Sequence, residues 1–146
     1  MDNYTVKLAD NEALKKKAFA IREEVFVIEQ KVSRSEEFDE FESISRHFVA
    51  LDDEGKPVGA ARWRKTKNGI KLERFAVKQT GRGQGIGQTL VQLVLDDIRA
   101  IEGAGHYLYL HAQLDAVGLY QKFNFEKIGD MFEECDIQHF KMQRTS

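Results

Sequence analysis

The stretch that most constrains this chain is a glycine-rich turn between a strand and an amphipathic helix, in residues 72–98. Before the turn, Glu73, Phe75 and Val77 alternate with the residues between them, which predicts a short strand ending at Val77. The turn carries glycine at every second position, namely Gly81, Gly83, Gly85 and Gly87. Glycine has no side chain to hold a ligand away from backbone N–H groups, so this turn is expected to let a ligand approach closely.

A helix is expected to begin near Ile86, because apolar residues recur from there at helical spacing. Its apolar face consists of Ile86, Leu90, Leu93, Val94, Ile98 and Ile101. The free N–H groups of a first helical turn and the positive end of the helix dipole favour an anion. The turn is therefore predicted to bind phosphate, and the alternative is an ordinary glycine-rich connection.

The spacing of the glycines excludes the two commonest phosphate-binding loops. A dinucleotide fingerprint needs glycines at relative positions one, three and six, and no register of this turn supplies the third of them. A mononucleotide P-loop needs lysine after its last glycine, where this chain has Gln88. The pattern that fits is Arg-x-x-Gly-x-Gly, formed by Arg82, Gly85 and Gly87.

Composition indicates one globular domain, residues 1–146, with a substantial core. The apolar share of 42% and the charged share of 32% are those of a soluble protein. The net charge of −2 argues against nucleic-acid binding, and no apolar run approaches the ~18 residues of a membrane span. The N-terminus does not resemble an export signal and Cys135 has no disulfide partner, so we expect a cytoplasmic protein.

The N-terminal residues predict a strand followed by a long helix. Alternating apolar residues from 4 to 8 predict the strand, and Asn11 is a suitable N-cap for a helix that runs to about Gln30. The apolar face of this helix consists of Leu14, Ala18, Ile21, Val25 and Ile28. Near its end, Arg22, Glu29 and Gln30 either face a substrate cleft or lie exposed to solvent, where carboxylates cost little.

Residues 31–46 have no firm periodicity and are acidic from Glu36 through Glu42. A loop of this length in a compact domain is usually functional or disordered. Its carboxylates either attract a cationic amine or form a solvated run of charge. The residues alone leave both interpretations open.

Three strands joined by tight turns are expected next, at residues 47–51, 58–64 and 72–77. Gly55 marks the first turn, and Lys67-Asn68-Gly69 is the strongest hairpin signal in the chain. These strands predict an antiparallel meander that ends at the glycine-rich turn.

Gly103 and Gly105 are expected to end the helix that follows the turn. Residues 107–112 are apolar on both faces, as in a buried strand that runs parallel to a neighbour. A short helix over about 115–122 follows, and Asn124 stands where a left-handed residue is needed. The last strand candidates are residues 127–128 and 137–142.

This order of elements resembles that of the GCN5-related N-acetyltransferase (GNAT) superfamily along essentially the whole chain. The glycine-rich turn resembles the family's acyl-CoA pyrophosphate loop, which follows a strand ending in a valine like Val77. A second family motif, Asn-x-x-Ala-x-x-x-Tyr-x-x-x-Gly-Phe, is matched with two departures by Gln113, Ala116, Tyr120, Asn124 and Phe125. The resemblance implies an α/β (α+β) fold with a mixed, mostly antiparallel sheet of six to seven strands, flanked by helices and splayed near Val77.

The chain also resembles the ElaA-type subgroup of small bacterial acetyltransferases. The residues that carry this looser resemblance are Arg22, Val25, Phe26, Val27, Glu29, Gln30, Asp39, His47, Glu133, Glu134, Ile137 and His139. It implies a fold and a cofactor without a settled substrate. The candidate substrate residues are Arg22, Glu29, Gln30, Glu134 and His139.

The resemblance implies direct acetyl transfer from acetyl-CoA to an amine acceptor, either a small molecule or an exposed amino group of a peptide. The implied contacts with coenzyme A are Phe75, Ala76, Val77, Arg82, Gly83, Gln84, Gly85, Ile86, Gly87, Gln88, Gln113 and Tyr120. The N–H of Ala76 or Val77 would also polarise the thioester carbonyl. Homodimers are common in the family, although no residue pattern here identifies a dimer interface.

Acetyl transfer to an amine needs a base for the ammonium proton and an acid for the leaving thiolate. Tyr120, at the family's tyrosine position, is predicted to be the acid, and its alternative role is packing. Glu73 is predicted to be the base, acting through water, and its alternative is a salt-bridged strand carboxylate. The reserve candidates for the base are His139, Glu134 and Glu29.

His47, His106 and His111 lack the spacing of metal ligands, so no metal is predicted. Two other functions stay open. A non-catalytic acyl-CoA sensor or interaction module would use the same glycine-rich turn without needing Tyr120 or a base. A nucleotide enzyme would be protected against heat by NAD or ATP and not by coenzyme A.

Overall fold

A computed structural model describes residues 4–146, which form one mixed sheet with helices on both faces. The strands are β1 (Tyr4–Leu8), β2 (Arg46–Asp52), β3 (Pro57–Thr66), β4 (Gly69–Val77), β5 (Tyr107–Gln113), β6 (Glu126–Glu134) and β7 (Ile137–Thr145). The α-helices are α1 (Glu12–Arg22), α2 (Arg34–Glu37), α3 (Ile86–Glu102) and α4 (Val117–Gln121). A π-helix, η1 (Glu23–Glu29), continues α1, and two short 3₁₀ turns, η2 (Gln79–Gly81) and η3 (Leu114–Ala116), precede α3 and α4.

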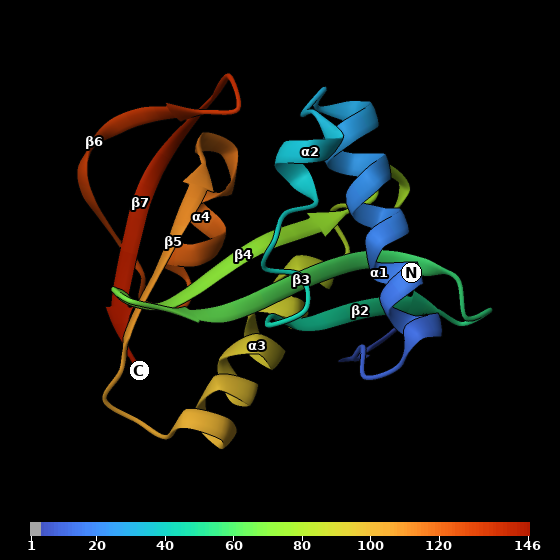
Figure 1. The fold of residues 1–146 in the computed structure, drawn as a ribbon, viewed down its shortest axis with the longest axis horizontal. Coiled ribbons are helices and arrows are strands. Elements are labelled where there is room, and N and C mark those ends of the chain that lie inside the picture. Colours follow the sequence, from blue (N-terminus) through green and yellow to red (C-terminus); the bar gives the residue numbers. More distant parts are fainter. Residues whose placement is uncertain (1–3) are drawn as a thin grey trace.

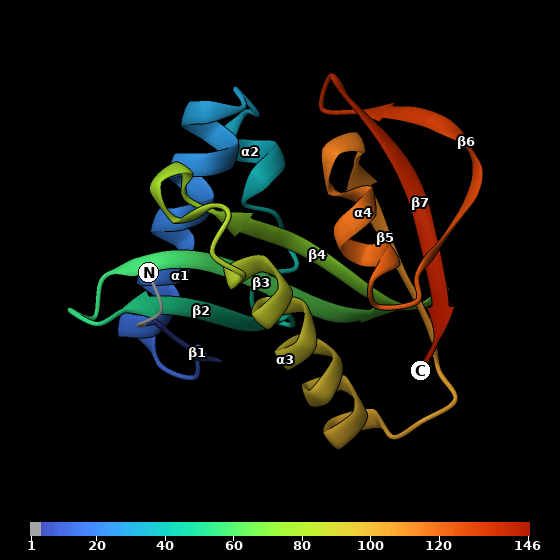
Figure 2. The same ribbon diagram turned by 180° about the vertical axis from the view of Figure 1, so that it is seen from behind.

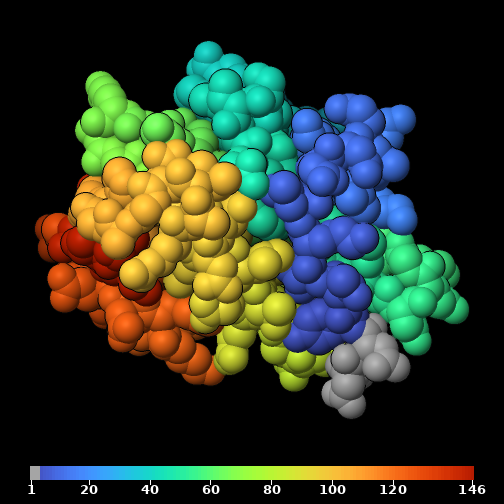
Figure 3. All heavy atoms as spheres, turned by 90° about the horizontal axis from the view of Figure 1, so that it is seen from below, coloured from blue at the N-terminus to red at the C-terminus, as the bar shows by residue number. Residues whose placement is uncertain are grey.

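The sheet separates two apolar clusters, one for each layer of helices. In Figure 1 α1 lies in front of the strands and α3 behind them, and Figure 2 shows α3 from its own side. The larger cluster joins α3 and α4 to the sheet, and its fully buried helix residues are Leu90, Val91, Val94 and Ile98. The smaller cluster joins α1 and η1 to the opposite face through Ile21 and Val25. In the space-filling view, α3 stretches across the surface between the N-terminal and C-terminal parts (Figure 3).

The strand order is β1-β2-β3-β4-β5-β7-β6, and every neighbouring pair except β4 and β5 is antiparallel. The predicted fold class, a mixed and mostly antiparallel sheet of six to seven strands flanked by helices, is therefore confirmed, and the sheet has seven strands. β4 and β5 pair only at Ile70 with Leu108 and at Lys71 with Tyr109. Beyond those pairs the two strands diverge toward the end of β4 (Figure 1), which is the predicted splay.

β4 also bends within its own length. Its pairing with β3 shifts register between Ala60 and Arg62, and Arg74 has a positive φ of 63°. Such a bulge re-aims the residues that follow it. Lys78 N–H donates to Val58 O, so the alternation of an antiparallel pair turns the polar groups of Val77 away from β3.

The long N-terminal helix is present, but it changes type halfway. Asn11 caps it, accepting a hydrogen bond from Leu14 N–H at 2.9 Å. At Arg22 the α-helix gives way to the π-helix, in which Gln30 N–H donates to Val25 O at 3.0 Å. The wider turn moves the apolar face, so Ile28 is 63% exposed and the prediction that it faces the core is wrong.

α3 begins and ends where the glycines predict. Gly85, with φ of 83°, is its N-cap, and Gly103, with φ of 81°, is its C-cap. Val91 is fully buried although it was not predicted to face the core, whereas Ile101 is 52% exposed, so its predicted burial is wrong. Within residues 4–146, no helix is long and apolar enough to cross a membrane.

Candidate functional site

The glycine-rich loop presents backbone N–H groups that the protein leaves unpaired. Gly81 N–H donates to Lys78 O at 2.8 Å, and Arg82 N–H donates to Gln79 O at 3.4 Å. From Gly83 through Gln88, no backbone N–H has a hydrogen-bond partner in the part of the chain that the structure describes. A diphosphate is a ligand whose oxygens fit such a run of donors at a helix start.

The glycines of this loop serve different purposes. Gly83 has a φ of 80° and Gly85 one of 83°, and a side chain at either position would be strained in this left-handed region. A Cβ on Gly83 would meet nothing within 4 Å. Glycine is therefore required at this position by the backbone conformation and not by a lack of space for a side chain. At Gly81, by contrast, a Cβ would lie 3.3 Å from Ile86 Cδ1, which is tight packing.

Arg82 is bound to a carboxylate of the π-helix. Its Nη1 and Nη2 donate to the two carboxylate oxygens of Glu29, both at 2.7 Å, and its Nε donates to Val77 O at 2.9 Å. The hydrogen bonds from Arg82 outweigh the effect of burial and lower the pKa of Glu29. Glu29 thus lies at the glycine-rich loop, outside the cavity where a substrate contact was predicted.

A cavity of about 380 Å³ fills the space where β4 and β5 diverge. Phe75, Gln113, Ala116 and Tyr120 line it on the side of α4. The opposite wall carries polar and charged side chains from β3, β4, β5, the 33–39 segment and the β6–β7 hairpin. Of the β4 residues predicted to bind the pantetheine and thioester, Phe75 thus lines the same cavity as the predicted acid, Tyr120, whereas Ala76 and Val77 do not line it.

An amide pair crosses the opening between η1 and β5. Gln113 Nε2 donates to Gln30 Oε1 at 2.8 Å, and Gln30 Nε2 donates back to Gln113 Oε1 at 3.3 Å. Both residues line the cavity. The longer arm of Gln113, compared with the asparagine of the family motif, is what reaches Gln30.

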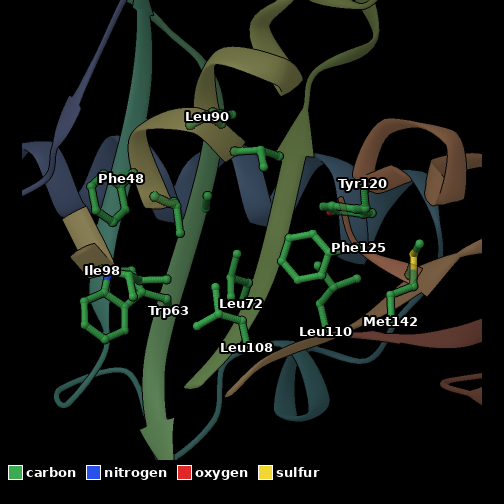
Figure 4. Close-up of a cluster of buried hydrophobic side chains, with 14 of the residues drawn as sticks. Phe48, Trp63, Leu72, Leu90, Ile98, Leu108, Leu110, Tyr120, Phe125 and Met142 are labelled. Carbon is green, nitrogen blue, oxygen red and sulfur yellow. The ribbon is translucent and has the colours of Figure 1, made fainter. Parts of the chain in front are cut away.

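Tyr120 is 6% exposed and packs edge-to-face against Phe75 and Phe125, with ring centroids 5.7 Å and 6.2 Å away. Figure 4 shows Tyr120 and Phe125 together at one end of the larger apolar cluster. Within residues 4–146 the Tyr120 hydroxyl has no hydrogen-bond partner, while the residue lines the cavity. Burial raises the pKa of Tyr120, so the hydroxyl keeps its proton at neutral pH.

Glu73 lines the cavity but is surrounded by cations. Its Oε2 accepts from Arg62 Nε at 2.9 Å and from Arg64 Nε at 2.7 Å, and Lys71 Nζ lies 3.4 Å from Oε1. Burial alone would raise the pKa of Glu73. The positive charges of neighbouring residues, of which Arg62 has the largest effect, outweigh burial and lower it. A carboxylate held in this way is a weak proton acceptor, which favours the alternative role of a salt-bridged strand residue.

Arginines hold the carboxylates of Glu37, Asp39 and Glu42, so the prediction of a solvated run of charge is wrong for these three, whereas Glu36 and Glu40 are exposed. Glu37 is 4% exposed and accepts from Arg22 Nε at 2.8 Å. Asp39 accepts from Arg62 Nη1 at 3.0 Å and from Nη2 at 2.7 Å. Arg22 also donates to both oxygens of Glu42, at 2.8 Å and 2.6 Å.

Burial and the ion pairs oppose each other in this segment, so the pKa values of its carboxylates shift in opposite directions. Burial raises the pKa of Asp39, but the hydrogen bond from Arg62 and its charge outweigh burial and bring the value to about 2. Burial dominates at Glu37 and raises its pKa. Arg22 is 1% exposed and does not line the cavity, so it fastens this segment in place of the predicted substrate contact.

A second titratable group of residues lies on β5 and the β6–β7 hairpin. His111 Nδ1 is 3.2 Å from Glu134 Oε2, and His139 Nε2 is 3.9 Å from Glu134 Oε1. The hydrogen bond from His111 lowers the pKa of Glu134 to about 2. His139 Nδ1 lies 2.7 Å from Ile137 O, which can only accept, so the neutral ring keeps its lone pair on Nε2.

His111, Arg64 and Lys71 line the cavity although they were not predicted as site residues. Arg64 and Lys71 are cross-strand partners in the β3–β4 hairpin. Their pairing could have been predicted by counting back along both strands from the Lys67-Asn68-Gly69 turn. The position of His111 could have been predicted from the alternation of side chains along β5, because it points to the other face of the strand from the buried Leu110. Within residues 4–146, no group of three or more His, Cys, Asp or Glu side chains has the arrangement of a metal site.

Comparison with known proteins places this geometry among acyltransferases. A family profile described as an acetyltransferase (GNAT) domain matches residues 10–146. The uncharacterized N-acetyltransferase YjcF of Bacillus subtilis is 41% identical over 138 residues, which cover 94% of this chain and 96% of that protein. The crystal structure of an acyl-CoA N-acyltransferase from Pseudomonas aeruginosa superposes with a TM-score of 0.82 at 26% identity, over 97% of this chain and 98% of that one. Escherichia coli ElaA shares the fold, with a TM-score of 0.79 at 24% identity over the same shares of the two chains.

Proposed function

Because the chain belongs to the GNAT acetyltransferase family, we propose that it transfers an acetyl group from acetyl-CoA to the nitrogen of an amine acceptor. The observation that carries this proposal is the run of unpaired N–H groups from Gly83 through Gln88. These donors fit a diphosphate, and the loop that carries them begins a few residues after β4, whose residues Lys71 to Phe75 line the cavity.

The parts of the site divide the work of binding. The loop amides and Arg82 would hold the diphosphate of acetyl-CoA, and Phe75, Ala76 and Val77 would align its pantetheine arm along the unpaired edge of β4. The thioester supplies an activated acyl carbon, to which the acceptor nitrogen bonds while the C–S bond breaks. A backbone N–H at the end of β4 would stabilise the charge that develops on the carbonyl oxygen.

Two proton movements remain for side chains. Tyr120 is the proposed acid, because its hydroxyl lines the cavity, keeps its proton and is free to donate to the leaving sulfur. We place the base at His139, whose Nε2 has a lone pair in the neutral ring and which also lines the cavity. Glu73 is less suited because cationic side chains already occupy its carboxylate.

Gly85→Glu tests the loop assignment. The new carboxylate would stand among the free amides, so we expect coenzyme A binding measured by calorimetry to be lost. Gly103→Glu is a matched control, because it adds the same charge at a similar positive φ to the other end of α3. Unchanged affinity in Gly85→Glu would refute the assignment.

An acceptor screen tests the reaction itself. The wild-type protein is incubated with acetyl-CoA, a panel of amines and a thiol reagent, and we expect thiol release that depends on the acceptor. Coenzyme A binding without thiol release across a broad panel would favour the non-catalytic sensor. Thermal protection by NAD or ATP without protection by coenzyme A would favour a nucleotide enzyme.

A further inference from the structure

We propose that the acceptor carries a carboxylate as well as its amine, and that Arg64 and Lys71 bind this carboxylate inside the cavity. The inference rests on the proposed acetyltransferase function and specifies its substrate class as amino acids. It replaces the expectation that an acidic surface selects a simple cation. The argument begins with the position of the two side chains.

Arg64 and Lys71 face each other across β3 and β4, at the end of β4 where it is still paired with β5. Both line the cavity, and their side chains are 13% and 17% exposed. The predicted thioester-binding residues Phe75 to Val77 lie at the other end of β4. An acceptor in the cavity would thus have the two cations at its far end and the acyl group at its near end.

Two buried arginines behind this wall, which do not line the cavity, are already matched by carboxylates. Arg62 contacts Asp39, Glu42 and Glu73, at 2.7, 2.9 and 2.7 Å. Arg22 binds Glu37 and Glu42, as described above. Such buried ions are stable only when their donors are satisfied, and these two arginines meet that condition.

Arg74 is matched in the same way. Its Nη2 donates to Asp39 Oδ2 at 3.1 Å, and its Nε donates to Glu37 O at 3.2 Å. Like Arg64 and Lys71 it lines the cavity, but these contacts already engage its guanidinium.

Arg64 and Lys71, in contrast, keep unused donors. Arg64 donates through Nε to Glu73, and its guanidinium lies 3.8 Å from the ring centroid of Phe41. Within residues 4–146, neither Nη atom of Arg64 has a hydrogen-bond partner. Lys71 Nζ shares the same Glu73 at 3.4 Å, so one carboxylate serves both cations. A planar guanidinium edge with free N–H groups matches a carboxylate.

The carboxylates that line the cavity already have partners within the protein. Glu36 accepts from Ser33 Oγ at 2.9 Å and from Cys135 Sγ at 3.4 Å. Glu134 is hydrogen-bonded to His111, and the charge of Lys71 also contributes to its lowered pKa. With Glu37, Asp39 and Glu73 held by arginines, the charged groups of this wall that keep unused hydrogen-bonding capacity toward a carboxylate are Arg64 and Lys71.

The test compares acceptors that differ only at the carboxylate. For a set of amino acids, kcat/KM of the wild-type protein is measured beside the corresponding amides and decarboxylated amines. We expect at least a tenfold preference for the free carboxylate, expressed mainly in KM. The preference should fall at least tenfold in Lys71→Met and in Arg64→Gln, and Arg64→Lys should recover less than half of it.

Lys65→Met is the matched control, because Lys65 is the exposed neighbour of Arg64 on β3 and pairs with Glu102. It should keep the full preference. A wild-type preference for amides or decarboxylated amines, or a carboxylate preference that survives both variants, would overturn the inference. Far-UV circular dichroism and thermal melts establish that each variant folds.

A binding measurement separates this inference from the proposed reaction. Calorimetric titration of amino acids into the wild-type protein saturated with coenzyme A should show binding that Lys71→Met weakens at least tenfold. Binding without thiol release would leave the carboxylate site standing and remove the transferase. Thiol release with simple amines, together with no binding of amino acids, would support the transferase and overturn the carboxylate site.

Discussion

Glu29 occupies both terminal nitrogens of Arg82 at 2.7 Å, although Arg82 is the side chain expected to meet the diphosphate. The two residues lie 53 positions apart and connect the end of the π-helix to the glycine-rich loop. A carboxylate is a chemical substitute for a phosphate as an arginine ligand. We therefore expect Glu29 to compete with a bound diphosphate for Arg82.

Glu29→Gln is expected to tighten coenzyme A binding about two- to fivefold, the range for removing an exposed ion pair. The measurement is calorimetric titration of coenzyme A at low ionic strength. Glu24→Gln, a neighbouring carboxylate without this contact, serves as the control. Weaker binding in Glu29→Gln would mean that Glu29 positions Arg82 and does not compete with the ligand.

Tyr120→Phe is expected to lower kcat at least tenfold while coenzyme A affinity and the melting temperature stay unchanged. The ring keeps its contacts with Phe75 and Phe125, and only the unpaired hydroxyl is lost. Tyr109→Phe is the control, because Tyr109 is similarly buried and its hydroxyl contacts Thr66 outside the cavity. A wild-type rate in Tyr120→Phe would reduce Tyr120 to a packing residue.

Asp39→Asn is expected to destabilise the protein by about 1–3 kcal/mol at pH 7, because it removes a carboxylate partner of Arg62. The pKa of Asp39 is about 2 in the folded protein, below its ordinary 3.8. Its contribution to stability is therefore complete above about pH 4 and is lost as the pH falls toward 2.

Urea unfolding measured between pH 7 and pH 2 should show this loss in the wild type and much less of it in Asp39→Asn. Asp53→Asn, in the exposed turn before β3, should change neither the stability nor its pH dependence. Equal acid sensitivity in the wild type and Asp39→Asn would contradict the assigned ion pair.

Leu90→Ala is expected to cost about 2–5 kcal/mol of unfolding free energy, because Leu90 is fully buried between α3 and the sheet. Ile101→Ala, at an exposed position of the same helix, should cost less than about 0.5 kcal/mol. Denaturant unfolding of the two variants measures the difference. Similar costs would show that the apolar face of α3 is wrongly placed.

The sequence predicted the fold well because its signals are local. Caps such as Asn11, the glycines at 85 and 103 and two-residue alternation each act within a few positions. The π-helix was missed because apolar spacing does not distinguish i−4 from i−5 hydrogen bonding; in the structure Val25 and Phe26 are its buried residues. Helical periodicity alone then placed Ile28 on the wrong face.

The ion pairs of the charged cavity wall could not be predicted from local sequence signals. Arg62 meets Asp39 across 23 positions and Arg22 meets Glu42 across 20, and such pairs depend on the tertiary fold. An acidic run in a loop has the same composition whether it is solvated or clamped by buried arginines. The roles predicted for Tyr120, Glu73 and the loop residues stay predictions until binding and rates are measured.

β4 and β5 pair at only two positions, so we expect the four strands β1 to β4 and the three strands β5 to β7 to rotate against each other near Ile70 and Leu108. A molecule seated along the free edge of β4 would brace the two parts against each other and restrict their rotation. Amide hydrogen exchange in β5 would then slow when coenzyme A is added. The rigidity of the enzyme would depend on the concentration of free and acylated coenzyme A around it.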